Sequence, residues 1–309
     1  MSRIALIVPC LNEELALPTL FAQAREHIPD ATIHVFDNGS TDRTLAVAQA
    51  HGAITHHVPE RGKGQVVARM FADVDADIYL MTDGDGTYDL SRAAEHVRLV
   101  REQRVDMVIG SRRATYGDSG SRPGHRFGNW FLTRLLGLLF RRRFEDVLSG
   151  YRVMSRRFVK TAPVLASGFE IEVMLTVHAL EVRSHIVEVP VNYLKRAGGS
   201  ASKLNTFRDG MRILGAIVYL FKEVRPFSFF NGAALLLATL SLLAGLPVVT
   251  EYQHTGLVPR FPTAILAASL MLAALISATC GLILDSVAAQ RRETKRLHFL
   301  QQPDPRTAR

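Results

Sequence analysis

The chain has 309 residues and a formal net charge of +8, and 48% of its residues are hydrophobic while 21% are charged. This length suffices for one large domain with additional elements, and the composition indicates an ordinary soluble part joined to a very apolar part. The positive charge leaves nucleic acid, an acidic membrane surface and phosphate-rich substrates open as partners.

Two features bear on the compartment of the protein. The cysteines, Cys10 and Cys280, lie far apart in the sequence, and the second is inside an apolar segment, so we expect two small buried residues rather than a disulfide. The first apolar run, residues 4–8, is too short for a signal peptide. We therefore expect the first part of the chain to remain in the cytoplasm.

Strand patterns alternate with helix patterns from residue 3 to about residue 110. Continuous apolar runs, typical of buried parallel strands, are separated by segments with helical spacing of their apolar residues. This rhythm predicts an α/β fold with a doubly wound, mostly parallel sheet, whose ligands bind at the carboxyl ends of the strands. The expected strands are residues 4–8, 32–36, 54–58, 78–81 and 106–109, and the expected helices are residues 13–27, 41–51, 64–72 and 91–103.

Two segments near the C-terminus, residues 227–249 and 261–284, are almost free of charged side chains. Each is long enough to cross a hydrocarbon core of about 30 Å, which takes roughly 20 helical residues. Their short link predicts a helical hairpin, and the basic residues on its outer flanks place both termini in the cytoplasm. A buried hairpin in a soluble protein is the alternative, which these lengths and flanks disfavour.

Two further segments combine apolar and basic residues. Residues 128–143 form an apolar helix that ends in an arginine cluster, and residues 204–225 carry apolar side chains at helical spacing opposite charged ones. Both suit helices in the plane of a membrane surface, with amphipathic helices packed on the sheet as the alternative. The expected division is a cytoplasmic α/β domain at residues 1–203, an interface helix at 204–225, two membrane helices within 226–286 and a basic cytoplasmic tail at 287–309.

The most acidic stretch, Asp83-Gly84-Asp85-Gly86, follows the expected strand 78–81. Two carboxylates at the end of one strand repel one another, and a divalent cation removes that repulsion. Cations such as Mg²⁺ commonly take one or two carboxylates together with substrate phosphates, and glycines let a diphosphate approach the backbone closely. Taken alone, this composition is also typical of an ordinary turn.

The other expected strands end in polar clusters as well. Asp37 lies ahead of a helix cap at Thr41 or Asp42, where its carboxylate can accept hydrogen bonds from a base or ribose. The basic loop at residues 60–64 precedes a helix, which suits phosphate binding. The chemically suggestive clusters at strand ends are residues 9–14, 37–42, 83–89 and 110–113.

A series of motifs follows in order along residues 3–225. They are Val8-Pro9-Cys10-Leu11-Asn12-Glu13-Glu14, Asp37-Asn38-Gly39-Ser40-Thr41-Asp42, Gly62-Lys63-Gly64, Asp83-Gly84-Asp85-Gly86, Gly110-Ser111-Arg112, Ser149-Gly150-Tyr151-Arg152, Gly168-Phe169-Glu170, and Lys195-Arg196 through Ser202-Lys203. The set resembles the family 2 glycosyltransferases with the GT-A fold. Within that family it resembles the branch of dolichyl-phosphate mannose synthases and bacterial polyprenyl-phosphate glycosyltransferases, some of which have two membrane spans.

The resemblance implies an enzyme of the cytoplasmic membrane that moves one sugar from a UDP- or GDP-sugar to a polyprenyl phosphate, with Mg²⁺ or Mn²⁺ as cofactor. Asp83 and Asp85 would be the metal ligands, and Asp85 the more direct one. The catalytic residues would be Asp85, Arg112 and Lys203, with Lys203 neutralising the donor diphosphate. The nucleotide-sugar would be held by Pro9, Asn12, Glu13, Asp37, Lys63 and Asp83, and the acceptor phosphate by Arg112, Arg126, Ser149 and Arg152.

One position departs from the family pattern. Thr87 stands where dolichyl-phosphate mannose synthases have a glutamine that helps to bind metal, so Thr87 or a water would take that place. A polyprenyl phosphate oxygen is already anionic at neutral pH, and no strong general base is needed. The transfer would require that the two substrates are aligned and that the charge of the leaving diphosphate is stabilised. In-line attack would invert the configuration at the anomeric carbon.

Other functions stay open as alternatives. A processive polysaccharide synthase would carry a Gln-x-x-Arg-Trp motif, but the single tryptophan, Trp130, follows Gly128-Asn129. A diacylglycerol acceptor would need a base to activate its hydroxyl, and none stands out. A non-catalytic, membrane-anchored nucleotide-sugar-binding protein would not need the motif residues that are present. Membrane lipids are expected partners, nucleic acid is not, and a homo-oligomer is left open.

Overall fold

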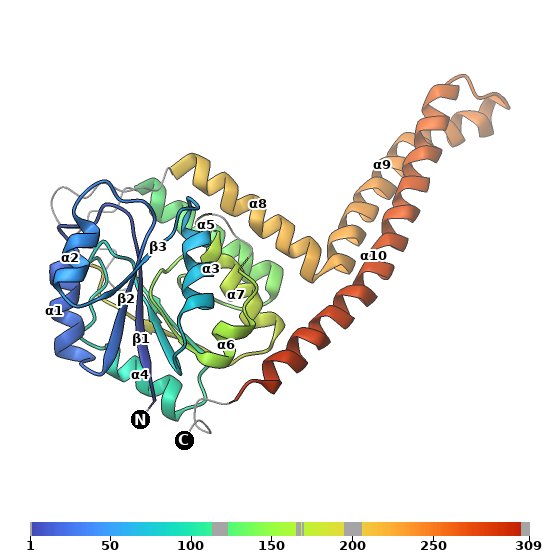
Figure 1. Ribbon diagram of the computed structural model, residues 1–309. Coiled ribbons are helices and arrows are strands. Elements are labelled where there is room, and N and C mark those ends of the chain that lie inside the picture. The colour runs from blue at the N-terminus through green and yellow to red at the C-terminus, as the bar shows by residue number, and fades with distance from the viewer. Residues whose placement is uncertain (1, 113–122, 165–167, 169, 195–205, 304–309) are drawn as a thin grey trace. The chain divides into compact units, whose positions relative to one another are not determined.

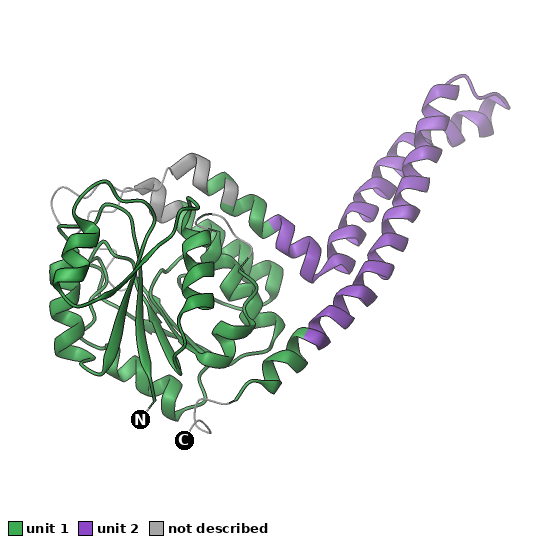
Figure 2. Cartoon of the chain, in the orientation of Figure 1, with its two compact units in different colours: residues 1–217, 295–309 green, residues 218–294 purple. Residues whose placement is uncertain are grey.

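The computed structural model describes residues 2–112, 123–164, 168, 170–194 and 206–303. The chain divides into two compact units, one comprising residues 1–217 with 295–309 and the other residues 218–294 (Figure 2). The first unit contains the sheet, and the second contains most of two long apolar helices.

The first unit is built on a seven-stranded sheet in the order β3-β2-β1-β4-β6-β5-β7. The strands are β1 (Ile4–Cys10), β2 (Ala31–Asp37), β3 (Ile54–His57), β4 (Ile78–Met81), β5 (Met107–Ser111), β6 (Arg152–Ser155) and β7 (Ile186–Pro190). Neighbouring strands are parallel except that β6 runs antiparallel to both β4 and β5. The predicted α/β fold with a mostly parallel sheet is therefore confirmed.

Helices cover both faces of the sheet (Figure 1). Those of the first unit are α1 (Leu17–His27), α2 (Thr44–Ala50), α3 (Lys63–Asp73), α4 (Ala93–Glu102), α5 (Pro123–Phe140), α6 (Arg156–Thr161) and α7 (Ile171–Glu181), and α8 (Thr206–Val224) follows them. Along β1, Leu6 and Val8 pack in a core with α1, α2 and α4, whereas Ala5 and Ile7 pack in a second core with α3, α6 and α7. This alternation follows from the period of two along a strand, and it explains why the strands are apolar on both faces.

The C-terminal end of α10 (Phe261–Gln301) belongs to the core of the first unit. Phe299 is 1% exposed and lies in the core formed with α3, α6 and α7. Lys295 forms an ion pair with Glu181 of α7 at 2.8 Å. The stretch 287–309 was predicted to be a basic tail, but it is helical as far as Gln301 and contributes to the hydrophobic core.

The second unit is a hairpin of α9 (Pro226–Thr255) and the part of α10 up to residue 294. Each helix has an 18-residue window with a mean hydropathy of 2.1, of which 17% is buried. Ser241 Oγ donates to the carbonyl of Ala267 at 2.7 Å, and Ser277 Oγ donates to the carbonyl of Phe230 at 2.9 Å. The predicted helical hairpin is confirmed, and both helices are long and apolar enough to cross a membrane.

Candidate functional site

Most of the sequence motifs meet at one edge of the sheet, which we term the carboxyl edge because β1, β2, β4 and β5 end there. Strand β6 runs in the opposite direction and therefore begins at this edge. Its first residue, Arg152, pairs with Met81 of β4 and with Ile109 of β5. The Ser149-Gly150-Tyr151 motif thus reaches the same place as the Asp83-Gly84-Asp85 motif, as binding at the carboxyl ends requires.

The loops that follow β1 and β2 are tied together by hydrogen bonds. The backbone N–H of Asn12 donates to Ser40 Oγ at 2.9 Å, and the side-chain oxygen of Asn12 accepts from the N–H of Thr41 at 2.7 Å. The N–H of Glu13 donates to Thr44 Oγ1 at 2.8 Å. Two segments that were predicted to hold the nucleotide-sugar therefore form one platform.

Asp37 fixes the turn after β2. It is 1% exposed, and its carboxylate accepts from the N–H groups of Gly39 and Ser40 at 3.1 and 3.2 Å. Gly39 has a φ of 79°, a left-handed conformation that glycine adopts without strain. The predicted contact of Asp37 with a base or ribose stays a prediction, since in this structure its oxygens shape the turn.

Asn38 joins this turn to the basic loop ahead of α3. Its side-chain nitrogen donates to the carbonyl groups of Val58 and Glu60 at 3.0 and 2.7 Å, and its side-chain oxygen accepts from the N–H of Gly62 at 2.8 Å. No role was predicted for Asn38, which lies within the motif at residues 37–42. Its role depends on long-range contacts, which local spacing does not reveal.

The Asp83-Gly84-Asp85 loop packs against the end of β1. A Cβ atom on Gly84 would lie 2.6 Å from Sγ of Cys10 and 3.0 Å from the carbonyl oxygen of Pro9. The first distance is shorter than real Cβ contacts, so only glycine fits without displacing its neighbours. Pro9 therefore helps to set the position of the acidic loop.

Asp85 and Asp83 are the carboxylates of this loop that suit a divalent cation. Asp85 is 5% exposed, and its Oδ1 accepts from Thr87 Oγ1 at 2.6 Å and from the Thr87 N–H at 3.2 Å. Among the described residues, no group of three or more His, Cys, Asp or Glu side chains gathers to hold a metal. A pair of carboxylates fits Mg²⁺ or Mn²⁺ with ligands added by water and a substrate diphosphate, rather than a closed structural zinc site.

Lys63 joins two carboxylates from distant parts of the chain. Its Nζ lies 2.6 Å from Asp83 Oδ1 and 2.6 Å from Glu172 Oε1, and 11% of its side chain is exposed. Burial lowers the pKa of Lys63, but Asp83 and Glu172 outweigh that effect and raise the pKa, so the ammonium stays charged. A Cβ on Gly150 would clash with the Asp83 carboxylate. Asp83 is therefore committed to an ion pair, although 29% of its side chain is exposed, whereas Asp85 is 5% exposed and accepts from Thr87.

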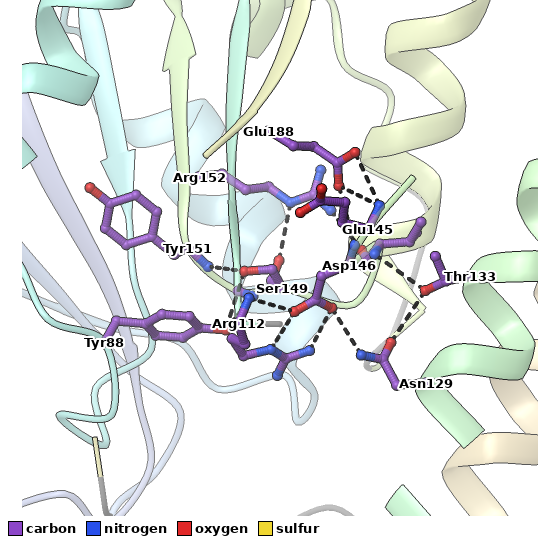
Figure 3. Close-up of polar contacts among 12 residues, drawn as sticks. Tyr88, Arg112, Asn129, Thr133, Glu145, Asp146, Ser149, Tyr151, Arg152 and Glu188 are labelled. Atoms are coloured by element: carbon purple, nitrogen blue, oxygen red, sulfur yellow. Dashed lines mark hydrogen bonds and ion pairs between the residues drawn. The ribbon is translucent and has the colours of Figure 1, made fainter. Parts of the chain in front are cut away.

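Arg112 is held by Asp146, a residue that sequence analysis did not single out. Nε and Nη2 of Arg112 donate to the carboxylate at 2.6 and 2.8 Å, and the Arg112 N–H donates at 3.2 Å (Figure 3). The Asp146 side chain is fully buried, whereas 17% of the Arg112 side chain is exposed. Burial raises the pKa of Asp146, but the Arg112 guanidinium outweighs it and holds that pKa below its usual range.

Ser149 and Arg152 lie beneath the surface of the carboxyl edge, and both are fully buried. The Arg152 guanidinium donates to the carbonyl groups of Val147 and Glu172 at 3.0 and 2.8 Å, and burial lowers its pKa to about 10. Ser149 Oγ accepts from the N–H of Tyr151 at 3.3 Å. The structure therefore does not favour the predicted contact of these two side chains with the acceptor phosphate, because they hold the loop that carries them.

Two tyrosines and a histidine brace the same loop. The Tyr88 hydroxyl accepts from the N–H of Gly150 at 2.9 Å, and His96 Nδ1 lies 2.8 Å from the Tyr151 hydroxyl. Burial, with a smaller contribution from Arg92, lowers the pKa of His96 to about 4. The imidazole is therefore neutral at pH 7.

Two predicted site residues have no described side chain. Lys203 lies outside the described residues, and Arg126 belongs to α5 but its side chain is not described. Their predicted contacts with the donor diphosphate and the acceptor phosphate stay predictions. Helix α5 itself reaches the site through Asn129, whose Nδ2 donates to Asp146 Oδ1 at 3.0 Å.

A half-open cleft of about 600 Å³ lies at the opposite edge of the sheet, where β1 and β2 begin. Its lining includes His34 and Arg101 but none of the predicted site residues. Two of its charged side chains, Arg3 and Asp75, form an ion pair with each other at 3.1 Å. The motifs and their geometry therefore favour the carboxyl edge as the functional site.

Known proteins resemble the chain over much of its length. The model of glycosyl transferase family 2 matches residues 5–161. The glycosyltransferase AglJ of Haloferax volcanii is 29% identical over 251 residues, which cover 81% of this chain and 82% of that protein. The undecaprenyl-phosphate mannosyltransferase of Micrococcus luteus is 26% identical over 220 residues, which cover 64% of this chain and 86% of that protein.

The fold is also found among solved structures. Glucosyl-3-phosphoglycerate synthase from Mycobacterium tuberculosis, solved in complex with Mn²⁺ and UDP-glucose, has a TM-score of 0.57 to this chain at 22% identity. The match covers 71% of this chain and 79% of that one. This likeness supports the same sheet architecture.

Proposed function

The chain belongs to glycosyl transferase family 2, and we propose that it transfers one sugar from a nucleotide-sugar to a polyprenyl phosphate. One observation carries the proposal: an acidic loop suited to a cation and a fixed, partly exposed arginine share an edge in a chain that has two span-length apolar helices. The name of the Micrococcus luteus relative supports the same class of acceptor.

The proposed acceptor makes modest chemical demands. A phosphate monoester presents an oxygen that is anionic at neutral pH, so the site needs no general base to activate it. Arg112 would hold the phosphate, because Asp146 fixes its guanidinium and part of the side chain stays exposed. In-line attack on the anomeric carbon, with the nucleoside diphosphate leaving from the opposite side, would give a β-linked product from an α-linked donor.

The donor would bind at the adjoining loops of the carboxyl edge. The platform that contains Asn12, Glu13 and Asp37 would hold the base and ribose of a UDP- or GDP-sugar. Asp85, with Asp83, would hold Mg²⁺ or Mn²⁺, which when bound supplies positive charge to the departing diphosphate. Lys63 would keep Asp83 in place through their ion pair.

The outer face of α5 would lie in the membrane surface. Trp130, Phe131 and Leu138 are 51%, 43% and 76% exposed, while Leu136 on the inner face is fully buried. Large exposed apolar side chains on a helix that ends next to basic residues suit the boundary between lipid headgroups and acyl chains. We place the two helices of the second unit across the cytoplasmic membrane, with the first unit and both termini in the cytoplasm.

The proposal is tested with the full-length protein in detergent, given undecaprenyl phosphate, Mg²⁺ or Mn²⁺, and a panel of UDP- and GDP-sugars. Release of nucleoside diphosphate and the mass of the extracted lipid are measured. We expect a lipid phosphate carrying one sugar, and we expect Asp85→Ala to form it far more slowly than wild type. Asp77→Ala, a substitution near the start of β4 at the other edge, is the control and should leave turnover unchanged.

Two results would contradict the proposal. Turnover that is found only when diacylglycerol replaces undecaprenyl phosphate in the same assay would make the protein a glycolipid-forming transferase. Donor binding without turnover on any lipid acceptor, in the presence of either metal, would make it a membrane-anchored nucleotide-sugar-binding protein.

A further inference from the structure

We infer that Asp146 is a positioning residue that presents Arg112 to the acceptor phosphate, and that Asn129 of α5 is the second holder of its carboxylate. The inference rests on the proposed function, because it requires that Arg112 binds the acceptor. It adds two residues to the acceptor site that are absent from the motif set. Neither would need to touch the substrate.

Both oxygens of Asp146 are occupied by donors. Oδ2 accepts from Arg112 Nε at 2.6 Å and from the Arg112 N–H at 3.2 Å, while Oδ1 accepts from Arg112 Nη2 at 2.8 Å and from Asn129 Nδ2 at 3.0 Å. The two parallel contacts to one guanidinium fix its plane as well as its position. Arg112 is thus oriented by a carboxylate that solvent does not reach (Figure 3).

The backbone at Asp146 and the side chain of its partner Asn129 are each held in place. The backbone N–H groups of Glu145 and Asp146 donate to the Glu188 carboxylate of β7 at 3.0 and 3.2 Å. On α5, Thr133 lies one turn after Asn129 and donates to its side-chain oxygen at 3.4 Å. Strand β7 and helix α5 therefore hold the anchor, and the orientation of Arg112 does not depend on a ligand.

A fixed arginine binds a phosphate at lower entropic cost than a mobile one. Arginine side chains have many rotamers, and a free one loses that freedom when it binds, whereas Asp146 has already restricted Arg112. Phosphate recognition by arginine depends on the plane of the guanidinium, so a misdirected side chain loses contacts even if its charge stays nearby. Removing the Asp146 charge should therefore weaken acceptor binding without affecting the donor platform.

The same strand offers a matched control. Asp106 precedes β5 and pairs with Arg157, with 3% and 15% of the two side chains exposed, close to the 0% and 17% of Asp146 and Arg112. Asp106 also accepts from the N–H of His185 at 3.0 Å. The Asp106–Arg157 pair lies at the start of β5, and Arg112 of the other pair lies at its end. An Asp-to-Asn substitution in each pair therefore separates an effect on stability from an effect on the acceptor site.

The experiment compares full-length wild type, Asp146→Asn, Asn129→Ala and Asp106→Asn in detergent. For Asp146→Asn we expect the KM for undecaprenyl phosphate to rise about 10- to 100-fold, with the donor KM within about 2-fold of wild type. Asn129→Ala keeps the ion pair and should shift the acceptor KM in the same direction by less. Asp106→Asn should lower the unfolding temperature while the acceptor KM stays unchanged.

A binding measurement without turnover accompanies the kinetics. Trp130 is the single tryptophan of the chain and lies next to Asn129, so its fluorescence reports on α5 beside the acceptor site. Titration with undecaprenyl phosphate, compared with undecaprenol, isolates the effect of the phosphate. We expect undecaprenyl phosphate, but not undecaprenol, to change the fluorescence of the wild type. The same change in Asp146→Asn should require a higher concentration of undecaprenyl phosphate.

Two outcomes overturn the inference, and they differ from failure of the proposed function. If wild type binds and uses undecaprenyl phosphate but Asp146→Asn has the same acceptor KM, the positioning role is wrong. If donor and acceptor KM rise together as the unfolding temperature falls, the Asp146–Arg112 pair supports the fold of the whole site and does not position Arg112 for the acceptor. If wild type neither binds nor uses undecaprenyl phosphate, the proposed function fails and the inference fails with it.

Discussion

The two edges of the sheet use similar ion pairs in different surroundings. At the carboxyl edge, Arg112 is paired with a buried carboxylate and stays partly exposed beside glycine-rich loops. At the amino edge, Arg157 is paired with Asp106, and its guanidinium lies 5.0 Å from the ring of Phe299, a core residue. Under the proposed function, we expect the charges at the carboxyl edge to serve binding and those at the amino edge to serve stability.

The largest expected effect is at the amino edge. Phe299→Ala removes a side chain that is 1% exposed, so we expect the free energy of unfolding to fall by about 3–5 kcal/mol. Thermal unfolding in detergent measures the loss, and turnover of the folded fraction at low temperature should stay close to wild type. An unchanged unfolding temperature would show that the end of α10 is not part of the core.

The next effect is at the carboxyl edge and concerns activity. Asp85→Ala removes the main metal-ligand candidate, and we expect kcat/KM to fall about 100- to 1,000-fold, equivalent to about 3–4 kcal/mol. The unfolding temperature should fall by only about a few degrees, because the substitution removes two hydrogen bonds to Thr87 but little apolar packing. Unchanged activity at the same metal concentration would contradict a functional role for the charged residues of the carboxyl edge.

A third prediction concerns acid stability. Burial lowers the pKa of His96 from 6.5 to about 4, so the folded chain binds a proton at this residue less readily than the unfolded chain does. Above pH 6.5 the histidine is neutral in both the folded and the unfolded chain, and its contribution to stability is complete. As the pH falls towards 4, only the unfolded chain binds the proton, so the free energy of unfolding decreases by at most about 3 kcal/mol. His96→Phe should therefore be less sensitive to acid between pH 6.5 and 4, as measured by unfolding temperature against pH. Equal acid sensitivity in the variant and wild type would assign the effect to other groups.

The smallest effect is expected on the surface of α4. Arg98 and Glu102 form an ion pair at 3.3 Å with 68% and 52% of their side chains exposed. Arg98→Ala should change the free energy of unfolding by less than about 0.5 kcal/mol, because solvent screens such pairs, and turnover should not change. A larger decrease in the free energy of unfolding would show that burial does not decide how much an ion pair contributes to the stability of this protein.

Local patterns predicted much of the framework. The five expected strands and the two apolar helices all form, because the hydrophobic period is a local property of the sequence. The motifs gather at the carboxyl edge because most of them follow strands that run in the same direction. Helix α1 begins at Leu17, later than the predicted start at residue 13. Residues before Leu17 form a turn, and Pro18 falls at the beginning of the helix, where its fixed φ is favourable.

Features that depend on distant parts of the chain were missed. The antiparallel direction of β6 and the assignment of Asp146 to Arg112 follow from tertiary pairing, which local spacing does not encode. The resemblance implied that Arg152 meets the acceptor, yet its guanidinium is buried and donates to backbone carbonyl groups. Phe299 falls in the stretch predicted to be a basic tail, because a single aromatic residue gives no periodic signal.

The linkage in the lipid product tests the central claim most directly. The donor is labelled with ¹³C at the anomeric carbon, and the purified lipid is examined by NMR. We expect coupling between the anomeric carbon and phosphorus together with the β configuration, opposite to that of an α-linked donor. A retained α configuration, or an anomeric carbon with no coupling to phosphorus, would contradict inverting transfer to a lipid phosphate.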